Sequence, residues 1–343
     1  MTRYQELADD IEASIAAGVL RAGDKLPSVR HTSERRGVSA STVFQAYYLL
    51  EARGLVRARE RSGYFVAARP HSAPPEPTQL SAPPGERFAV VDVSERVFEV
   101  LESSMDRDVV PLGSAFPSPR LFPLQRLGQA LARAARQADP RSALADLTPG
   151  SMALRRQIAR RHLADGLPLS PSDLVITNGA LEALNLCLAA VTRPGGAVVI
   201  ESPCFYGALQ ALERMGLSAI EVPTHPGEGM DLAALETAVQ RHRPQAIWLM
   251  TSFQNPLGSL MPEARKKALV ELATRHQLPL IEDDVYGELY FGEHRPPPAK
   301  AFDTEGWVLH CASFSKCLAP GWRVGWTAPG RFTRAVARQK LTT

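Results

Sequence analysis

The first hydrophobic pattern along the chain has helical spacing. In residues 4–17, apolar side chains share one face and acidic side chains occupy the opposite face, and the apolar positions are Leu7, Ile11 and Ile15. This spacing predicts a helix that Gly18 ends. Pro27 and Ser28 then open a shorter helix that extends to about Arg36, and we expect Ser28 to be its N-cap.

A third helix follows a glycine turn at Gly37 and extends from Ser39 to Arg53. Its inward stripe consists of Val43, Ala46, Tyr47 and Leu50. Short helix, glycine turn and helix form the helix-turn-helix pattern. Ser41, Thr42 and Gln45 are left near the outward N-terminal end, where a recognition helix meets base edges and phosphates.

Two short strands, 55–59 and 63–66, follow this helix and are joined at Arg61-Ser62-Gly63. Arginines at positions 53, 57, 59, 61 and 69 accompany a single acid, Glu60. A basic hairpin behind a helix-turn-helix is typical of a wing that contacts DNA phosphates or the minor groove. The alternative is a small helical adaptor with a solvated basic hairpin.

Residues 1–69 resemble the winged helix-turn-helix domain of the GntR family of bacterial regulators. The matching segments are KLPSVR, GVSASTV, LEARGLV and SGYFV, although Thr32-Ser33 replaces the small apolar pair usual in the second helix. We expect contacts with an operator in double-stranded DNA from the following residues: Ser28, Arg30, Ser39, Ser41, Thr42, Gln45, Arg59, Arg61 and Gly63.

The segment 70–86 contains prolines together with Ser, Ala and Glu and has no periodicity, so we expect a Pro-rich linker there. From Asp173 onward, apolar strands alternate with amphipathic helices. This alternation predicts an α/β domain over 87–343 with a mostly parallel, doubly wound sheet. Ligands of such sheets bind at the carboxyl ends of the strands.

Polar residues with chemical uses follow several predicted strands. They are Asn178-Gly179-Ala180, Asn255, Asp283 with Tyr286 three residues later, and Lys316. A desolvated lysine can form a Schiff base with a carbonyl, while Ser313, Ser315 and Arg323 can hold a phosphate. This combination predicts pyridoxal 5′-phosphate, and the alternative for Lys316 alone is a solvated lysine in a Ser-rich loop.

The other groups suit the same cofactor. A carboxylate such as Asp283 keeps the pyridine nitrogen protonated, and Asn255 and Tyr286 can donate to the phenolic oxygen. Backbone amides at Asn178, Gly179 and Ala180 suit the phosphate. Phe205 or Tyr206 can supply an aromatic face over the ring.

Composition narrows the class of protein. The chain has 343 residues, a length that favours two domains, and its content of 45% apolar and 22% charged residues is typical of globular proteins. Its net charge is +3. The four cysteines have neither metal-ligand nor redox-motif spacing, so we expect reduced thiols, a cytoplasmic protein and no metal site. We find neither a signal-peptide pattern nor an apolar run long enough to cross a bilayer.

Residues from about 110 to 343 resemble a fold-type I aminotransferase domain. The matching segments are LRRQIAR, TNGALEAL, ESPCFYG, TSFQNPLG, LIEDDVYGEL and SFSKCLAPGWRVGW. The resemblance implies that Lys316 is the Schiff-base lysine, that Asp283 is the pyridine partner and that Phe205 is the stacking residue. Together with the winged helix, this domain makes the chain similar to the MocR-type regulators of the GntR family.

Family members continue into a C-terminal segment that carries an arginine for the substrate carboxylate, and no residue here takes that role. We therefore expect either a chain that is incomplete at its C-terminus or a protein without a complete amino-acid site. The predicted function is a dimeric, DNA-binding transcription regulator that binds pyridoxal phosphate and senses an amino compound. The alternatives are an aminotransferase with a DNA-binding appendage, a DNA-binding module on a cofactor-free scaffold, and a truncated product that does not fold stably.

Overall fold

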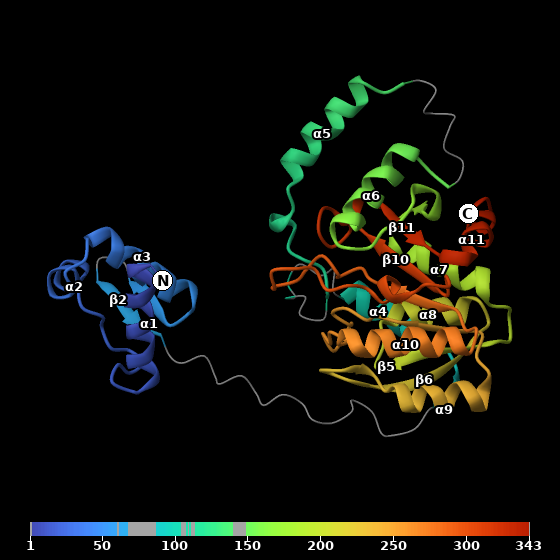
Figure 1. Cartoon of the computed structure of the whole chain (residues 1–343), viewed down its shortest axis with the longest axis horizontal. Coiled ribbons are helices and arrows are strands. Elements are labelled where there is room, and N and C mark those ends of the chain that lie inside the picture. The colour runs from blue at the N-terminus through green and yellow to red at the C-terminus, as the bar shows by residue number, and fades with distance from the viewer. Residues whose placement is uncertain are drawn as a thin grey trace. The chain divides into compact units, whose positions relative to one another are not determined.

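The computed structural model describes residues 2–59, 62–67, 87–103, 108, 110, 114–139 and 149–342. The chain divides into two compact units, Met1–Glu76 and Pro77–Thr343, which Figure 1 shows and which we describe separately. The predicted linker, 70–86, lies outside the described residues. Within the described residues, no helix is both long and apolar enough to cross a membrane.

The first unit is a three-helix domain with a hairpin. Its elements are α1 (Arg3–Ala16), α2 (Val29–Arg36), α3 (Ala40–Ala52), β1 (Val56–Arg59) and β2 (Gly63–Val66). The two strands pair antiparallel, with Val56 opposite Val66. The stripe predicted for the third helix is buried, and it packs against Leu7 and Ile15 of α1. The helix-turn-helix and the hairpin predicted from the sequence are both present.

Serine side chains begin the two helices of this motif. The Ser28 hydroxyl accepts the His31 N–H at 3.2 Å, and the Ser39 hydroxyl accepts the Thr42 N–H at 3.2 Å. Each bond satisfies one of the amides that a helix leaves without an internal partner. Gly37, with φ of 61°, ends α2 in the left-handed conformation that glycine adopts at little cost.

The unusual Thr32 is explained by a hydrogen-bond chain. Its side chain is buried, and its hydroxyl lies 2.8 Å from the Tyr47 hydroxyl. Tyr47 in turn donates to the Pro27 carbonyl at 2.8 Å, so Thr32 is the donor to Tyr47. These two hydrogen bonds link α2, α3 and the turn before α2, and they satisfy polar groups that would otherwise be buried without a partner.

The second unit is built on a sheet in which, within the described residues, nine strands take part. Its central strands are parallel: β6 (Ser218–His225), β5 (Ala197–Ser202), β8 (Ala246–Leu249), β9 (Leu280–Asp283) and β10 (Val308–Ser313). At one end β11 (Gly325–Ala328) pairs antiparallel with β10 and with β4 (Val175–Thr177). At the other end β3 (Arg87–Val90) and the short β7 (Gly229–Met230) pair antiparallel with β6.

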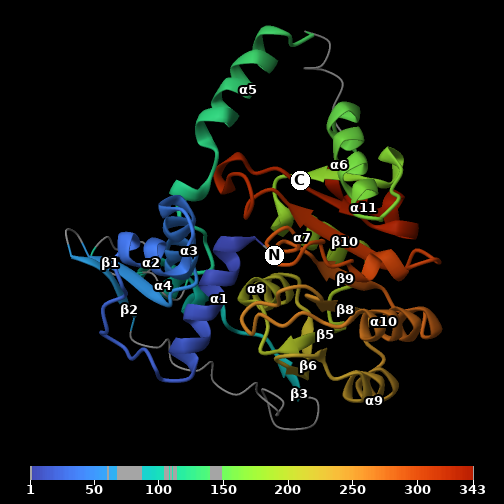
Figure 2. The ribbon, with the colours of Figure 1, turned by 60° about the vertical axis from the view of Figure 1, so that its left-hand side comes forward.

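Helices cover both faces of this sheet, as the views in Figures 1 and 2 show. One face packs against α7 (Ala180–Val191), α8 (Tyr206–Arg214) and α11 (Thr333–Lys340). The other face packs against α9 (Leu232–His242), α10 (Glu263–Arg275) and α6 (Met152–Ala164). The mostly parallel, doubly wound α/β sheet predicted from the sequence is therefore confirmed.

Two further helices precede α6. They are α4 (Ser94–Ser103), which lies beside α8, and α5 (Leu124–Arg136), whose side chains are almost all exposed. In Figure 1, α5 extends away from the sheet. A short segment before α5, beginning at Ser114, returns to the carboxyl edge of the sheet, where it contacts Lys316.

Candidate cofactor site and DNA-binding face

Lys316 lies in the loop after β10, at the carboxyl edge of the sheet. Its Nζ donates to the Ala115 carbonyl at 2.9 Å and lies 3.8 Å from the centre of the Phe116 ring and 5.5 Å from that of Tyr286. Burial lowers the pKa of this amine, although the nearby Asp283 acts in the opposite direction. A lysine with a lowered pKa more readily supplies the neutral amine that attacks a carbonyl.

Asp283 ends β9, the strand beside β10. Burial raises the pKa of its carboxyl to about 7, although the Val285 N–H, which donates to Oδ1 at 3.3 Å, favours the ionised form. Tyr286 follows in the same loop, and burial raises the pKa of its phenol to about 12. Its side chain is hydrogen-bonded to that of Asn255, which follows β8.

Aromatic residues follow β5 at the same edge. The rings of Phe205 and Tyr206 lie 4.8 Å apart at their centres, with a tilt of 52°. Gly207 makes room for them, because a Cβ there would lie 2.4 Å from the Phe205 ring. Gln254 ties this loop to the loop after β8, since its amide donates to the Pro203 carbonyl at 2.8 Å.

The loop between β4 and α7 approaches Arg323. The Arg323 Nη2 donates to the Asn178 carbonyl at 3.0 Å, and a Cβ at Gly179, where φ is 89°, would lie 2.5 Å from the same nitrogen. Ala180 begins α7, so its amide belongs to the helix end that favours an anion. The Glu182 carboxylate already accepts the Asn178 N–H, which leaves the following amides as the candidates for a phosphate.

Ser313 ends β10 and pairs with Gly325 of β11, which in turn pairs with Thr177 of β4, and Ser315 follows in the loop after β10. Both side chains are buried, and the Ser315 N–H donates to the Ser313 Oγ at 3.3 Å. Gly325 of β11 allows the close approach of the β4 loop, because a Cβ there would lie 2.4 Å from the Gly179 backbone. Glycine is thus favoured at 325 by this contact, and at 179 by the positive φ and the nearby Arg323 guanidinium.

The donor set fits pyridoxal phosphate. Five kinds of group lie at one edge of the sheet. They are a half-buried amine, a buried carboxylate on the neighbouring strand, a tyrosine paired with an amide, two aromatic rings, and a helix end with an arginine. These groups match the aldehyde, the pyridine nitrogen, the phenolic oxygen, the ring and the phosphate of the cofactor. The individual roles of the residues stay predictions.

A buried cluster that the sequence analysis did not identify lies behind this edge. Asp284 accepts from His310 Nε2 at 2.9 Å and from Arg295 Nη2 at 2.5 Å. Burial opposes ionisation of Asp284, but the His310 hydrogen bond and the Arg295 charge outweigh it and lower its pKa. Because Asp284 follows Asp283 directly, the cluster fixes the backbone from which Asp283 and Tyr286 extend.

The sequence analysis also missed the segment that covers Lys316. Ala115, which Phe116 follows, is 201 residues from the lysine along the chain, and the surrounding SAFPSPR has neither helical nor strand periodicity. The available signal was a single aromatic side chain between small residues and prolines. That pattern does not indicate which part of the fold the segment will contact.

The predicted DNA-binding residues lie on the first unit. Ser28 and Ser39 cap α2 and α3, Ser41 and Gln45 are exposed on α3, and Thr42 is half-buried with its hydroxyl 2.8 Å from that of Ser39. Arg30 is 90% exposed and pairs with Glu34. Their contacts with DNA stay predictions.

The hairpin carries the remaining predicted contacts. Arg59 ends β1, and its guanidinium stacks 4.5 Å from the centre of the Phe65 ring, with Lys25 on the same ring at 5.9 Å. Gly63 begins β2 with φ of 97°. Arg61 lies outside the described residues. Lys25 was not singled out in the sequence, and its position beside Phe65 adds a cation to the basic hairpin.

Comparison with known proteins identifies both units. Residues 3–66 match the family of bacterial regulatory proteins called gntR, and residues 107–338 match the aminotransferase class I and II family. The HTH-type transcriptional regulator YdcR of Escherichia coli (strain K12) is 49% identical over 341 residues, which are 99% of this chain and 72% of that protein.

Solved aminotransferases share the fold of the second unit. The multiple substrate aminotransferase of Thermococcus profundus has a TM-score of 0.66 and 29% identity, covering 74% of this chain and 64% of its own. The α-aminoadipate aminotransferase LysN of Thermus thermophilus, complexed with N-(5′-phosphopyridoxyl)-L-leucine, has a TM-score of 0.61 and 31% identity, covering 74% of this chain and 66% of its own. This chain therefore spans less than two thirds of either enzyme.

The regulator is similar along nearly the whole chain, whereas the enzymes are similar over the second unit. The order of the two matches, with the DNA-binding unit first, is the order predicted from the sequence. The chain belongs to the GntR family of bacterial transcription regulators, in the MocR type that joins a winged helix-turn-helix to a class I and II aminotransferase domain.

Proposed function

We propose that this regulator uses its aminotransferase domain as a pyridoxal-phosphate-dependent sensor of an amino compound. The observation that carries the proposal is the convergence of the Lys316 amine, the Asp283 carboxylate and the Tyr286–Asn255 pair at one edge of the sheet. The cofactor supplies an electrophilic carbon and an electron-accepting ring when it is bound. A sensor needs these properties to recognise a primary amine.

Each residue has a role in this proposal. Lys316 is the covalent attachment point, and Asp283 neutralises the charge of the protonated pyridine nitrogen. Tyr286 and Asn255 hold the phenolic oxygen, and Phe205, with Tyr206 beside it, stacks on the ring. The phosphate is held by the α7 end at Gly179 and Ala180, with Ser313, Ser315 and Arg323.

Sensing is proposed to reach DNA by linkage. An amino compound that competes with Lys316 stabilises one arrangement of a homodimer, and that arrangement presents its two winged helices to a paired operator differently. Residues 70–86 are proposed as the linker between the units, so their length limits the half-site spacings that the dimer can reach. Since the operator is genomic DNA, we place the protein in the cytoplasm.

The first test is the visible absorption spectrum of the full chain, recorded after incubation with pyridoxal phosphate and removal of the unbound cofactor, which is itself yellow. We expect a yellow band with the wild-type chain and with Lys267→Ala, which removes an exposed lysine of α10, but not with Lys316→Ala. Borohydride should then fix the cofactor on a peptide that contains Lys316, as mass spectrometry would show. A band of equal strength in Lys316→Ala, or a modified peptide elsewhere, would exclude the proposed attachment.

The identity to solved aminotransferases favours a second function, turnover of an amino donor with a keto acid. In such a reaction Lys316, whose pKa burial lowers, carries the proton. Incubation of the loaded chain with amino donors and 2-oxoglutarate distinguishes the two. Product formed over many turnovers supports the enzyme, and a spectral shift that stops at one equivalent supports the sensor.

A further inference from the structure

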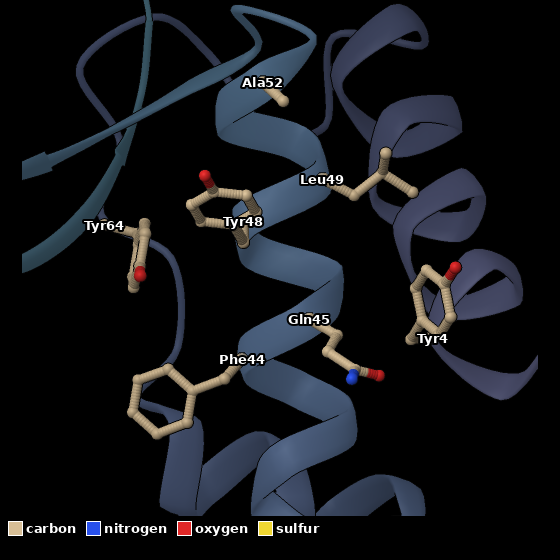
Figure 3. A pocket seen from close by; sticks show the side chains of 7 residues that line it. All are labelled: Tyr4, Phe44, Gln45, Tyr48, Leu49, Ala52 and Tyr64. Carbon is tan, nitrogen blue, oxygen red and sulfur yellow. The ribbon is translucent and has the colours of Figure 1, made fainter. Parts of the chain in front are cut away.

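The outward face of α3 carries two aromatic side chains that the DNA-binding predictions did not use. Phe44 is 54% exposed and Tyr48 is 73% exposed, and both line a hollow over α3 (Figure 3). Tyr4 and Tyr64 border the same hollow from α1 and β2. Large aromatic side chains gathered on an exposed face indicate a surface that contacts another molecule.

The helical register places Phe44 among the predicted base contacts. Because Val43, Ala46, Tyr47 and Leu50 are buried, the opposite stripe of α3 presents Ser41, Phe44, Gln45 and Tyr48. Phe44 is one turn beyond Ser41 and directly precedes Gln45, so it belongs to the N-terminal half of the helix. That half is the part of a recognition helix that reaches base edges.

The charges around this face favour a nucleic acid as its partner. None of the described residues that line the hollow is acidic. Exposed hydroxyls stand at the start of α3, and the same unit carries Lys25 and Arg59 on its hairpin side. The hydroxyls beside the aromatic side chains, together with the cations that Phe65 holds elsewhere on the same unit, suit a partner that carries phosphates and apolar groups.

One base of the major groove offers such an apolar group. Thymine carries a C5-methyl there, whereas the other bases present hydrogen-bonding atoms at the corresponding edge. We propose that Phe44 is a specificity-determining residue that reads a thymine methyl in the operator half-site. The inference rests on the DNA-binding role of the first unit and adds the class of base that α3 selects.

The experiment uses the full chain and a library of duplexes with a random 20-base-pair centre. The wild-type chain selects its preferred duplex, and each thymine of that duplex is then replaced by uracil, which lacks the methyl. We expect one uracil position per half-site to weaken binding, measured by fluorescence anisotropy, by about fourfold, the worth of one buried methyl. Phe44→Ala should bind the thymine and uracil duplexes equally, and Phe44→Leu should keep part of the preference.

Tyr48→Ala is the matched control, because it removes an even more exposed aromatic side chain from the next turn of the same face. It should keep the fourfold preference for thymine. The inference is overturned if the wild type does not distinguish thymine from uracil, or if Tyr48→Ala rather than Phe44→Ala removes the preference. It is also overturned if both variants bind the selected duplexes as the wild type does, since neither aromatic side chain would then contact the DNA.

Failure of the DNA-binding role itself gives a different result. In that case the wild-type chain enriches no sequence from the library at any salt concentration. Enrichment without a methyl effect contradicts only the role of Phe44. Thermal unfolding of each variant shows whether a loss of binding comes from a loss of folded protein. Because the Phe44 side chain is half-exposed, its substitution should lower the stability of the domain only a little.

Discussion

The Asp283 carboxyl is buried at the end of β9, where ionisation is unfavourable. Its side chain is 2% exposed, and burial raises the pKa from its ordinary value of 3.8 to about 7. The folded chain without cofactor therefore keeps a proton that the unfolded chain releases between about pH 4 and pH 7. Its free energy of unfolding falls as the pH rises through this window, because the unfolded state binds fewer protons.

This cost gives a prediction with opposite signs for stability and binding. Asp283→Asn removes the buried charge, so at pH 8 it should raise the free energy of unfolding of the cofactor-free chain by on the order of 3 kcal/mol, and by much less at pH 4.5. Urea unfolding at the two pH values measures this difference. The same variant should retain pyridoxal phosphate at least about tenfold less tightly, because the pyridine nitrogen loses its charged partner.

Glu271→Gln, on the exposed face of α10, is the control for the removal of a carboxylate. Its unfolding should change little at either pH. If Asp283→Asn destabilised the chain at pH 8, the carboxylate would have an unidentified stabilising partner. If it retained the cofactor as well as the wild type, Asp283 would not be the pyridine partner.

At the scale of elements, local signals allowed prediction wherever a residue acts on its own neighbours. Ser28 and Ser39 were predicted to begin two helices, and each does so by accepting a backbone N–H three residues later. The alternation of strands and helices was enough to place Asn255, Asp283 and Lys316 on one edge, since parallel strands end on the same side.

Contacts between distant segments could not be predicted in this way. Phe116 lies against Lys316 because a non-periodic segment returns to the sheet, and the Asp284–Arg295 pair forms through an irregular loop. β3 was not predicted either, because Phe88 and Val90 are exposed and leave no buried stripe in the sequence. The sequence pattern reveals an element only where buried residues recur at a regular spacing, and these three features have no such spacing.

The cap of α3 combines a structural and a functional role, which three substitutions of Ser39 separate. Ser39→Ala should destabilise α3 by about 1 kcal/mol through loss of the cap. Ser39→Asn and Ser39→Asp keep a capping side chain and should keep the stability of the helix. Hydrogen exchange of the α3 amides in the full chain, measured by mass spectrometry, reports this difference.

DNA binding then tests the predicted phosphate contact at Ser39. Ser39→Asp adds a negative charge at the start of α3, so it should weaken DNA binding at low salt by at least about tenfold if phosphates lie nearby. Ser39→Asn should bind nearly as the wild type does. Equal binding by the Asp and Asn variants would place Ser39 away from the DNA and leave it only its capping role.

At the scale of the whole molecule, the chain joins a basic hairpin to a large domain of nearly balanced charge. The net charge of the chain is +3, so its attraction to DNA must come from local groups such as Arg59 and Lys25 rather than from total charge. Phe65 holds both cations, which reduces the conformational entropy that they lose on binding.

Arg59→Ala should weaken DNA binding across all sequences and reduce the slope of log K against log[salt] by about 1, the value for one phosphate contact. Anisotropy titrations between about 50 and 200 mM salt would give the slope, because DNA affinity changes strongly with salt over this range. Arg36→Ala is the control, since Arg36 is already paired with Asp10 at 2.8 Å. An unchanged slope for Arg59→Ala would remove the hairpin from the DNA interface.

The hydrogen-bond chain from Thr32 through Tyr47 to Pro27 has a consequence for how this domain can evolve. Loss of the Thr32 hydroxyl alone removes one of the two hydrogen bonds. Loss of the Tyr47 hydroxyl alone leaves the buried Thr32 hydroxyl without an acceptor. A variant that keeps Tyr47 still satisfies the Pro27 carbonyl, whereas replacement of both side chains leaves that carbonyl without its donor. Among related sequences, a hydroxyl at position 32 should therefore occur only where position 47 also carries one.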